Sequence, residues 1–151
     1  MKKNLLAVCR RILLFLFLSL QVTFLYAGKN KGREYYQLTV YHFKTAAQEQ
    51  TLNNYLKNAL LPALHRMGTD KAGVFKALAN DTAADKLIYV FVTMKSLDAV
   101  IKIPAKLNAD TAYLSTGADY INIAYQQPAY TRMENIVLLA FPLAPAMQVL
   151  N

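Results

Sequence analysis

Histidine and tyrosine are the side chains of this chain that could transfer a proton or hold a ligand. The two histidines, His42 and His65, have no second histidine at ligand spacing and no carboxylate cluster beside them. Because a metal site needs several converging ligands, we expect no metal and no cofactor. His42 falls near the end of a strand-like segment, where a hydrogen bond at the sheet rim is its simplest role. Proton transfer or ligand binding is the alternative.

Ten tyrosines are more than the core of one small domain requires. Each has an apolar ring and a hydroxyl that commonly finds a partner at an interface, so packing between two copies is the simplest interpretation. A ligand-binding box is the alternative. Ser96 and Ser115 lack the glycine elbow and nearby base of a serine nucleophile, and the five dispersed glycines form no phosphate loop. The sequence therefore identifies no catalytic residue.

The N-terminal residues 1–27 have the pattern of a secretory signal peptide. Basic residues come first, an apolar run follows over 12–20, and Ala27 precedes Gly28. The apolar run is shorter than the ~20 residues of a membrane span, although an uncleaved anchor is the alternative. We expect cleavage after Ala27, an exported (periplasmic or secreted) protein, and no membrane attachment afterwards.

Cleavage would change both the charge and the thiol content. Seventeen basic and nine acidic residues give the whole chain a net charge of +8. Without the four basic residues of 1–27 the excess is thirteen over nine, or +4. The remaining charge is scattered apart from a flexible leader, residues 28–33, so we expect no nucleic-acid partner. Cys9, the single cysteine, leaves with the signal, so the mature chain has no disulfide or thiolate site.

The rest of the chain alternates between strand and helix patterns. Residues 34–44, EYYQLTVYHFK, alternate at period two, whereas apolar residues over 47–67 recur at steps of three and four. The expected elements, in chain order, are strand 34–44, helix 47–67, strand 72–78, hairpin loop 79–85, strand 86–94, helix 97–103, helical stretch 108–125 and strand 134–141. This order predicts an α+β fold: a ferredoxin-like βαββαβ unit with an antiparallel sheet and helices on one face. The domain is expected over 34–142, with 143–151 as a C-terminal tail or truncated linker.

Individual residues set the expected limits of the helices. Gly68 is a natural stop for the first helix, and Pro62 should bend its last turn. Ser96 can cap the helix that begins at 97, Pro104 should interrupt that helix, and Gly117 should weaken the next one.

The two faces of the predicted sheet differ in composition. The first strand places Tyr36, Leu38, Val40 and His42 on one side and Tyr35, Gln37, Thr39, Tyr41 and Phe43 on the other. The strand at 86–94 separates Ile88, Val90 and Val92 from Leu87, Tyr89, Phe91 and Thr93. We expect the aliphatic sets to face the helices and the aromatic sets to lie open. A homodimer with two sheets face to face, a closed dimeric α/β-barrel, would bury the open aromatic surface.

These segments resemble the NIPSNAP family, within the dimeric α/β-barrel group. The resemblance rests on YYQLTVYHFK at 35–44, on YLKNALLPALHRMG at 55–68 followed by GVFKAL at 73–78, and on QPAYTRMENIVLLAF at 127–141. It implies the fold and the pairing of units, and no particular reaction. Family members commonly have Glu-Leu-Arg where this chain has Gln37, Leu38 and Thr39. Many carry two units in tandem, whereas this chain has one.

Two functions follow as hypotheses. The first is an exported NIPSNAP-like, self-associating binding or scaffold module of unassigned activity. The alternative is a cofactor-independent oxygenase or isomerase acting on an aromatic or polycyclic small molecule held between two paired sheets. The expected ligand-binding residues are Gln37, Thr39, Tyr41 and Tyr89, with His42 at the rim; haem binding is a further variant.

Two short segments resemble the Asp-Thr-small signal for O-glycosylation of exported bacterial proteins. They are Asp81-Thr82-Ala83 and Asp110-Thr111-Ala112. Because a glycan needs an exposed acceptor, Thr82 in the expected loop is the better candidate of the two.

Overall fold

The computed structural model describes residues 32–69 and 71–148. The predicted signal peptide and residues 28–31 of the leader lie outside the described residues. The elements, in chain order, are β1 (Tyr35–Phe43), α2 (Ala46–Tyr55), the π-helical turn η1 (Leu56–Leu60), α3 (Leu61–Arg66), β2 (Ala72–Lys76), β3 (Lys86–Met94), α4 (Leu97–Ala109), α5 (Thr111–Thr116), α6 (Ala118–Ile121) and β4 (Arg132–Leu139). No helix in this described part is long and apolar enough to cross a membrane.

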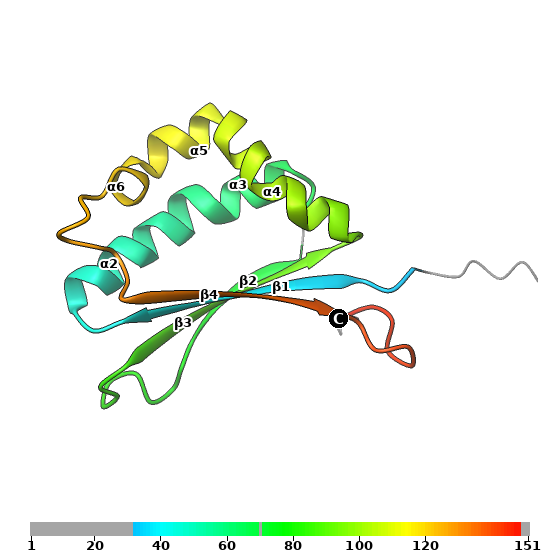
Figure 1. Cartoon of the computed structure of the whole chain (residues 1–151), viewed down its shortest axis with the longest axis horizontal. Coiled ribbons are helices and arrows are strands. Elements are labelled where there is room, and N and C mark those ends of the chain that lie inside the picture. The colour runs from blue at the N-terminus through cyan, green and yellow to red at the C-terminus, as the bar shows by residue number, and fades with distance from the viewer. Residues whose placement is uncertain (1–31, 70, 149–151) are drawn as a thin grey trace, which may run out of the picture. The chain divides into compact units, whose positions relative to one another are not determined.

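The four strands form one antiparallel sheet in the order β2-β3-β1-β4. The helices all lie on one face of this sheet, and the opposite face has no covering layer in the described chain (Figure 1). The predicted α+β class and the one-sided arrangement are confirmed, and the strand order is consistent with a ferredoxin-like unit. The closed barrel expected between two copies stays a prediction.

The strand register shows which side of β1 faces the helices. Thr39 is paired with Val90, and Tyr41 with Ile88. Directly paired residues of antiparallel strands point to the same face. The odd-numbered residues of β1, from Tyr35 to Phe43, therefore face the helices. Our prediction that Leu38 and Val40 face the helices was therefore wrong, whereas the prediction for β3 was correct. Both sides of β1 are apolar, so residue type alone could not separate them.

The first helical segment runs without interruption from α2 through η1 to α3. A capping box at Thr45 and Gln48 begins it. Pro62 cannot donate a hydrogen bond, and its ring would crowd the carbonyl of Asn58 in a regular helix. The π-helical turn directly before it, in which the Leu61 N–H donates to the Leu56 carbonyl, widens the helix at that place.

Gly68 ends this segment as predicted. Its φ is +79°, which only glycine adopts readily. The Gly68 N–H donates to the His65 carbonyl at 2.9 Å, and the Thr69 N–H donates to the Leu64 carbonyl at 3.0 Å. These two bonds form a Schellman motif.

The second helical region differs from the prediction at Pro104 and agrees with it at Gly117. Ser96 caps α4 by accepting from the Ala99 N–H at 3.1 Å, but α4 continues past Pro104 to Ala109. A proline inside a helix removes one backbone bond, and packing of α4 on the sheet retains the helix there. Gly117 separates α5 from α6. A Cβ atom there would lie 2.9 Å from the Tyr113 carbonyl oxygen, so the position favours glycine.

The main core lies between the helices and the covered face of the sheet. Its largest fully buried side chains come from β1, β3 and the first helical segment; they are Phe43, Leu52, Leu56, Leu64, Ile88 and Val90. After β4, the chain turns back to the start of β1. The Glu34 N–H donates to the Pro145 carbonyl at 2.8 Å, and the Glu34 carboxylate accepts from the Met147 N–H at 2.9 Å. Residues 143–148 are thus held against the domain.

Candidate functional site

A cavity of about 260 Å³ lies between the covered face of the sheet and the helices. Its floor is formed by residues of β1, β3 and β4, and its walls by η1, α3, α4, α5 and α6 together with Tyr55 at the end of α2. Helical and strand segments that are far apart in sequence therefore build one site. The cavity combines aliphatic side chains with tyrosines and a few uncharged polar groups, as ligand sites commonly do.

Four tyrosines form its aromatic wall. Tyr55 and Tyr120 stack with ring centroids 3.8 Å apart and planes 12° apart, and the Tyr41 ring meets Tyr120 edge-on at 6.5 Å. The hydroxyls of Tyr55 and Tyr113 are hydrogen-bonded to each other at 2.9 Å. Burial raises the pKa of Tyr41 to about 12, and burial also raises the pKa of Tyr55 and Tyr120 well above the ordinary value. These hydroxyls are neutral at physiological pH and act as hydrogen-bonding groups.

A second feature of the cavity is a group of three polar side chains on its floor. The Thr39 hydroxyl donates to the Asn135 amide oxygen at 2.7 Å, and the Gln37 amide N–H donates to the same oxygen at 3.5 Å. Thr39 is buried, Gln37 is half-buried, and Asn135 is exposed on the edge strand β4. Because β1 and β4 pair Thr39 with Asn135, the sheet register itself holds these groups side by side.

The cavity lies beside the edge strand β4. The side chains of β4 that face the helices are Met133, Asn135, Val137 and Leu139. Met133 is 40% exposed and Leu139 is 43% exposed, so the helices do not cover this edge of the sheet. A ligand would enter the cavity over β4.

Our predicted ligand-binding residues lie on two different faces of the sheet. Gln37, Thr39 and Tyr41 line the cavity together. Tyr89 and His42 point to the open face, since Tyr89 is paired with Val40, and His42 with Leu87. The five residues therefore do not form one pocket. The cavity lies on the helix side of the sheet, whereas we predicted from the sequence a ligand site between two paired sheets.

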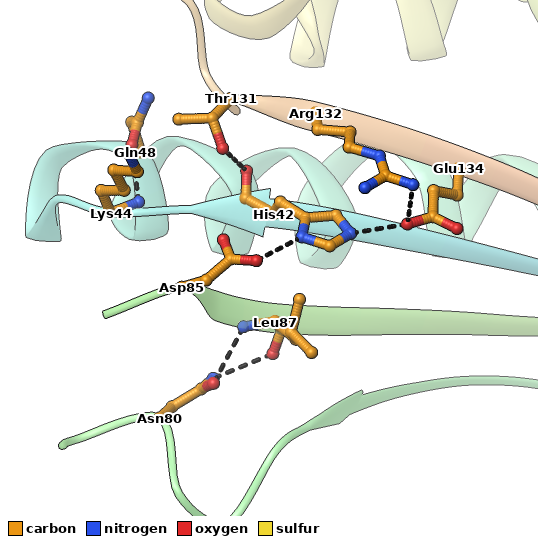
Figure 2. A network of polar contacts seen from close by, with 9 residues as sticks. All are labelled: His42, Lys44, Gln48, Asn80, Asp85, Leu87, Thr131, Arg132 and Glu134. Atoms are coloured by element: carbon orange, nitrogen blue, oxygen red, sulfur yellow. Dashed lines mark hydrogen bonds and ion pairs between the residues drawn. The ribbon is translucent and has the colours of Figure 1, made fainter. Parts of the chain in front are cut away.

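His42 lies in a network of charged groups on the open face (Figure 2). Its Nδ1 lies 2.7 Å from an Asp85 carboxylate oxygen and its Nε2 lies 2.9 Å from a Glu134 oxygen, which also accepts from Arg132 at 2.8 Å. The hydrogen bond to Asp85 raises the pKa of His42, burial partly opposes this, and the bond to Glu134 raises it further. The protonated ring, with two donors, matches both carboxylates.

This network does not form a metal site. The two carboxylates bond to different nitrogens on opposite sides of the ring, so the three groups do not converge on one point. Among residues 32–69 and 71–148, no group of three histidine, cysteine, aspartate or glutamate side chains could hold a metal ion. The hydrogen bonds at the sheet rim that we expected for His42 are present.

The remainder of the open face is an apolar surface. Tyr36 and Phe91 stack with ring centroids 5.2 Å apart. Around them, the register places on the same face the side chains Leu38, Val40, Phe75, Tyr89, Ile136 and Leu138. Phe75, Ile136 and Leu138 are exposed. The open face is thus the whole uncovered side of the sheet, with this apolar set, Tyr36 and Phe91 beside the His42 network.

Several lining residues of the cavity were not predicted from the sequence, among them Tyr55, Tyr113, Tyr120 and Asn135. Tyr55 belonged to the predicted apolar stripe, and the seven-residue step between Tyr113 and Tyr120 is two helical turns, which would have placed them on one side of a continuous helix. Asn135 is an uncharged polar residue in an otherwise apolar strand. That last signal, together with the pairing of the first and last strands in a ferredoxin-like unit, could have found the Thr39–Asn135 contact.

The candidate glycosylation threonines are both exposed. Thr82 lies in the turn between β2 and β3, which Asn80 anchors through two hydrogen bonds to the Leu87 backbone at 2.8 and 2.9 Å (Figure 2). Thr111 is the first residue of α5, directly after Asp110, which caps that helix and pairs with Arg66 at 2.6 Å.

The chain matches no protein-family model and no curated protein. The resemblance to the NIPSNAP family therefore stays a prediction from the sequence.

Proposed function

We propose that this domain is an exported, self-associating binding module of the NIPSNAP type, in which two copies pair through their open faces. The observation that carries the proposal is the apolar character of the open face, which is built from side chains of all four strands. Contiguous exposed apolar surface of this kind marks an interaction site. The sheet–helix cavity lies on the opposite side, so pairing leaves it accessible to a ligand.

A second copy of the chain fits the open face in size. Strands of nine, nine, eight and five residues, at about 3.3 Å a residue and about 4.8 Å apart, give each face an area of roughly 490 Å². Two such faces together bury about 1,000 Å², close to the smallest area of a specific interface. A two-fold axis would bring each face against itself, which is the commonest arrangement of a homodimer.

The charges on the open face are compatible with pairing. His42, Asp85, Glu134 and Arg132 are hydrogen-bonded to one another at one end of the sheet. When the His42 ring is protonated, each carboxylate contacts a cation, and the network then carries little net charge into the interface. The apolar residues then form the centre of the contact, with the charged network at its rim, as in typical interfaces.

The alternative function, a cofactor-independent oxygenase or isomerase, has less support. Such an enzyme needs a group that can move a proton beside the substrate. Among the described residues that line the cavity none is charged and none is histidine, while His42 lies on the other face. The tyrosine hydroxyls hold their protons too tightly to act as bases at neutral pH.

A matched pair of isoleucine variants tests the pairing. Ile136 is 39% exposed on the open face, and Ile101 is 68% exposed on α4, on the helix side of the sheet. We expect the purified protein and Ile101→Lys to sediment as dimers at about 100 µM, well above a micromolar dissociation constant. Ile136→Lys should sediment as a monomer, because its charge would be buried in the contact. A monomeric wild-type protein, or a dimeric Ile136→Lys, would contradict the proposal.

Export rests on the pattern of residues 1–27. N-terminal sequencing of the protein recovered from a secreting bacterial host tests it. A chain beginning close to Gly28 is expected, and an intact N-terminus at Met1 would count against export.

A further inference from the structure

We infer that the sheet–helix cavity binds a neutral, planar molecule of one or two rings that carries a hydrogen-bond donor beside an acceptor, as a lactam or a carboxamide does. The inference deepens the proposed function, because it names the ligand class of the binding module. It does not depend on whether two copies pair. The size, the charge and the polar floor of the cavity carry it.

The size and the walls of the cavity suit a flat ring system. A cavity of about 150 Å³ holds benzene, so about 260 Å³ has room for two fused rings. Tyr41, Tyr55 and Tyr120 contribute aromatic rings to its lining, and Leu64, Val90 and Ile103 contribute aliphatic side chains. Aromatic side chains favour stacked or edge-on contacts with another ring.

The charge of the lining excludes ionised ligands. None of the described side chains that line the cavity is acidic or basic, so a carboxylate or an ammonium group would enter without a counter-charge. Burying an unpaired ionised group is very unfavourable. The raised pKa values of the tyrosines keep this lining neutral at physiological pH.

The floor provides one donor and one acceptor at neighbouring positions. The Asn135 amide oxygen accepts hydrogen bonds from Thr39 and Gln37. The amide nitrogen of Asn135 therefore points away from these two residues and can donate to a ligand. Gln37 uses its amide nitrogen in this contact, which leaves its amide oxygen as an acceptor. Within the described part of the chain, no side chain bonds to either of these two groups. A ligand carbonyl can accept from Asn135 while an adjacent N–H donates to Gln37.

Three probes of nearly equal size test this class in the purified protein. They are 2-quinolinone, its N-methyl derivative and 2-naphthoate, titrated by calorimetry or by ligand-observed NMR. We expect 2-quinolinone to bind with a dissociation constant on the order of 0.1 to 1 mM. The N-methyl derivative, which lacks the donor, should bind about tenfold more weakly. The carboxylate should bind about a hundredfold more weakly or not at all.

A matched pair of tryptophan variants tests the location. Met133 lines the cavity, whereas Leu139 lies on the same face of β4 about 20 Å farther along the strand and does not line it. Both side chains are substantially exposed, so tryptophan fits at either place. Met133→Trp should abolish binding of 2-quinolinone, and Leu139→Trp should retain it.

Several results would overturn the inference. The first is no binding of 2-quinolinone up to 5 mM, roughly five times the weakest expected dissociation constant. The others are equal binding of 2-naphthoate and equal loss of binding in both tryptophan variants. Sedimentation of the same samples separates the two proposals. A dimer that binds no probe contradicts the ligand class alone, and a monomer that binds 2-quinolinone contradicts the pairing alone.

Discussion

The two faces of the sheet are both apolar, yet they differ in what covers them and in the kind of polar side chains that they carry. On the helix side of the sheet, polar side chains such as Thr39 and Asn135 are uncharged and bond to each other beside a cavity. The open face also carries charged groups, which are paired, as His42 is with Asp85 and Glu134. The residue composition of a sheet face therefore does not show whether that face belongs to the core. The layer of helices that covers one face decides it. We assign ligand binding to the covered face and pairing to the open face.

The strongest test of this difference compares one residue type on the two faces. Ile88 is fully buried under the helices, whereas Ile136 is 39% exposed on the open face. Ile88→Ala should lower the free energy of unfolding by about 2–5 kcal/mol, because it leaves a cavity in the core. Ile136→Ala should cost less than about 1.5 kcal/mol in the monomer, since its side chain is already in contact with water.

Urea denaturation at two protein concentrations measures both effects. The loss in Ile136→Ala should increase with concentration if the open face is buried between copies, and the loss in Ile88→Ala should not. Equal and concentration-independent losses would remove the distinction between the faces.

A smaller effect is expected at the tyrosine wall of the covered face. Tyr55→Phe removes one partner of the hydroxyl pair and leaves the buried Tyr113 hydroxyl without it. We expect a loss of about 1–3 kcal/mol in the free energy of unfolding, measured by the same denaturation. Tyr125→Phe is the control, because Tyr125 is 95% exposed and should change stability by no more than about 0.5 kcal/mol. A neutral Tyr55→Phe would show that water or a ligand replaces the hydroxyl pair.

The smallest effect concerns His42 on the open face and the pH dependence of its contribution to stability. His42 has a pKa raised above the ordinary 6.5 by its hydrogen bonds, first to Asp85 and then to Glu134. A pKa raised by folding stabilises the folded protein fully below the unfolded value, and this contribution is lost as the pH rises through the folded pKa.

Asp85→Asn should therefore lower the pKa of His42, as followed by NMR of its ring protons. It should reduce stability more at pH 6 than at pH 9. An unchanged pKa in Asp85→Asn would mean that Asp85 does not bond to the protonated ring in solution.

Much of the fold could be predicted from residue patterns. The limits of β3 were correct to the residue, since a run of β-branched and aromatic residues ends at polar turn residues on one side and at a helix cap, Ser96, on the other. Gly68 and Gly117 marked real ends of helices because their backbone positions or close contacts require glycine. These signals are local, and local signals are visible in a sequence.

Two features could not be predicted in this way: which side of β1 faces the helices, and that α4 continues past Pro104. Tyr41 and Phe43 compete with Leu38 and Val40 for the core, and only the pairing with Ile88 and its neighbours decides between them. Tertiary packing likewise allows α4 to continue through Pro104. The cavity depends on contacts such as Thr39 with Asn135, ninety-six residues apart, which no local pattern contains.

The central claim is that the open face is covered by a second copy in solution, and methyl NMR with a soluble paramagnetic agent tests it directly in the wild-type protein. Ile88, Ile101 and Ile136 serve as buried, exposed and open-face reporters. We predict that at several hundred micromolar, about a hundred times an expected micromolar dissociation constant, Ile136 is protected from relaxation like Ile88 and becomes accessible on dilution. If Ile136 relaxes as strongly as Ile101 at every concentration, the open face is not an interface between copies.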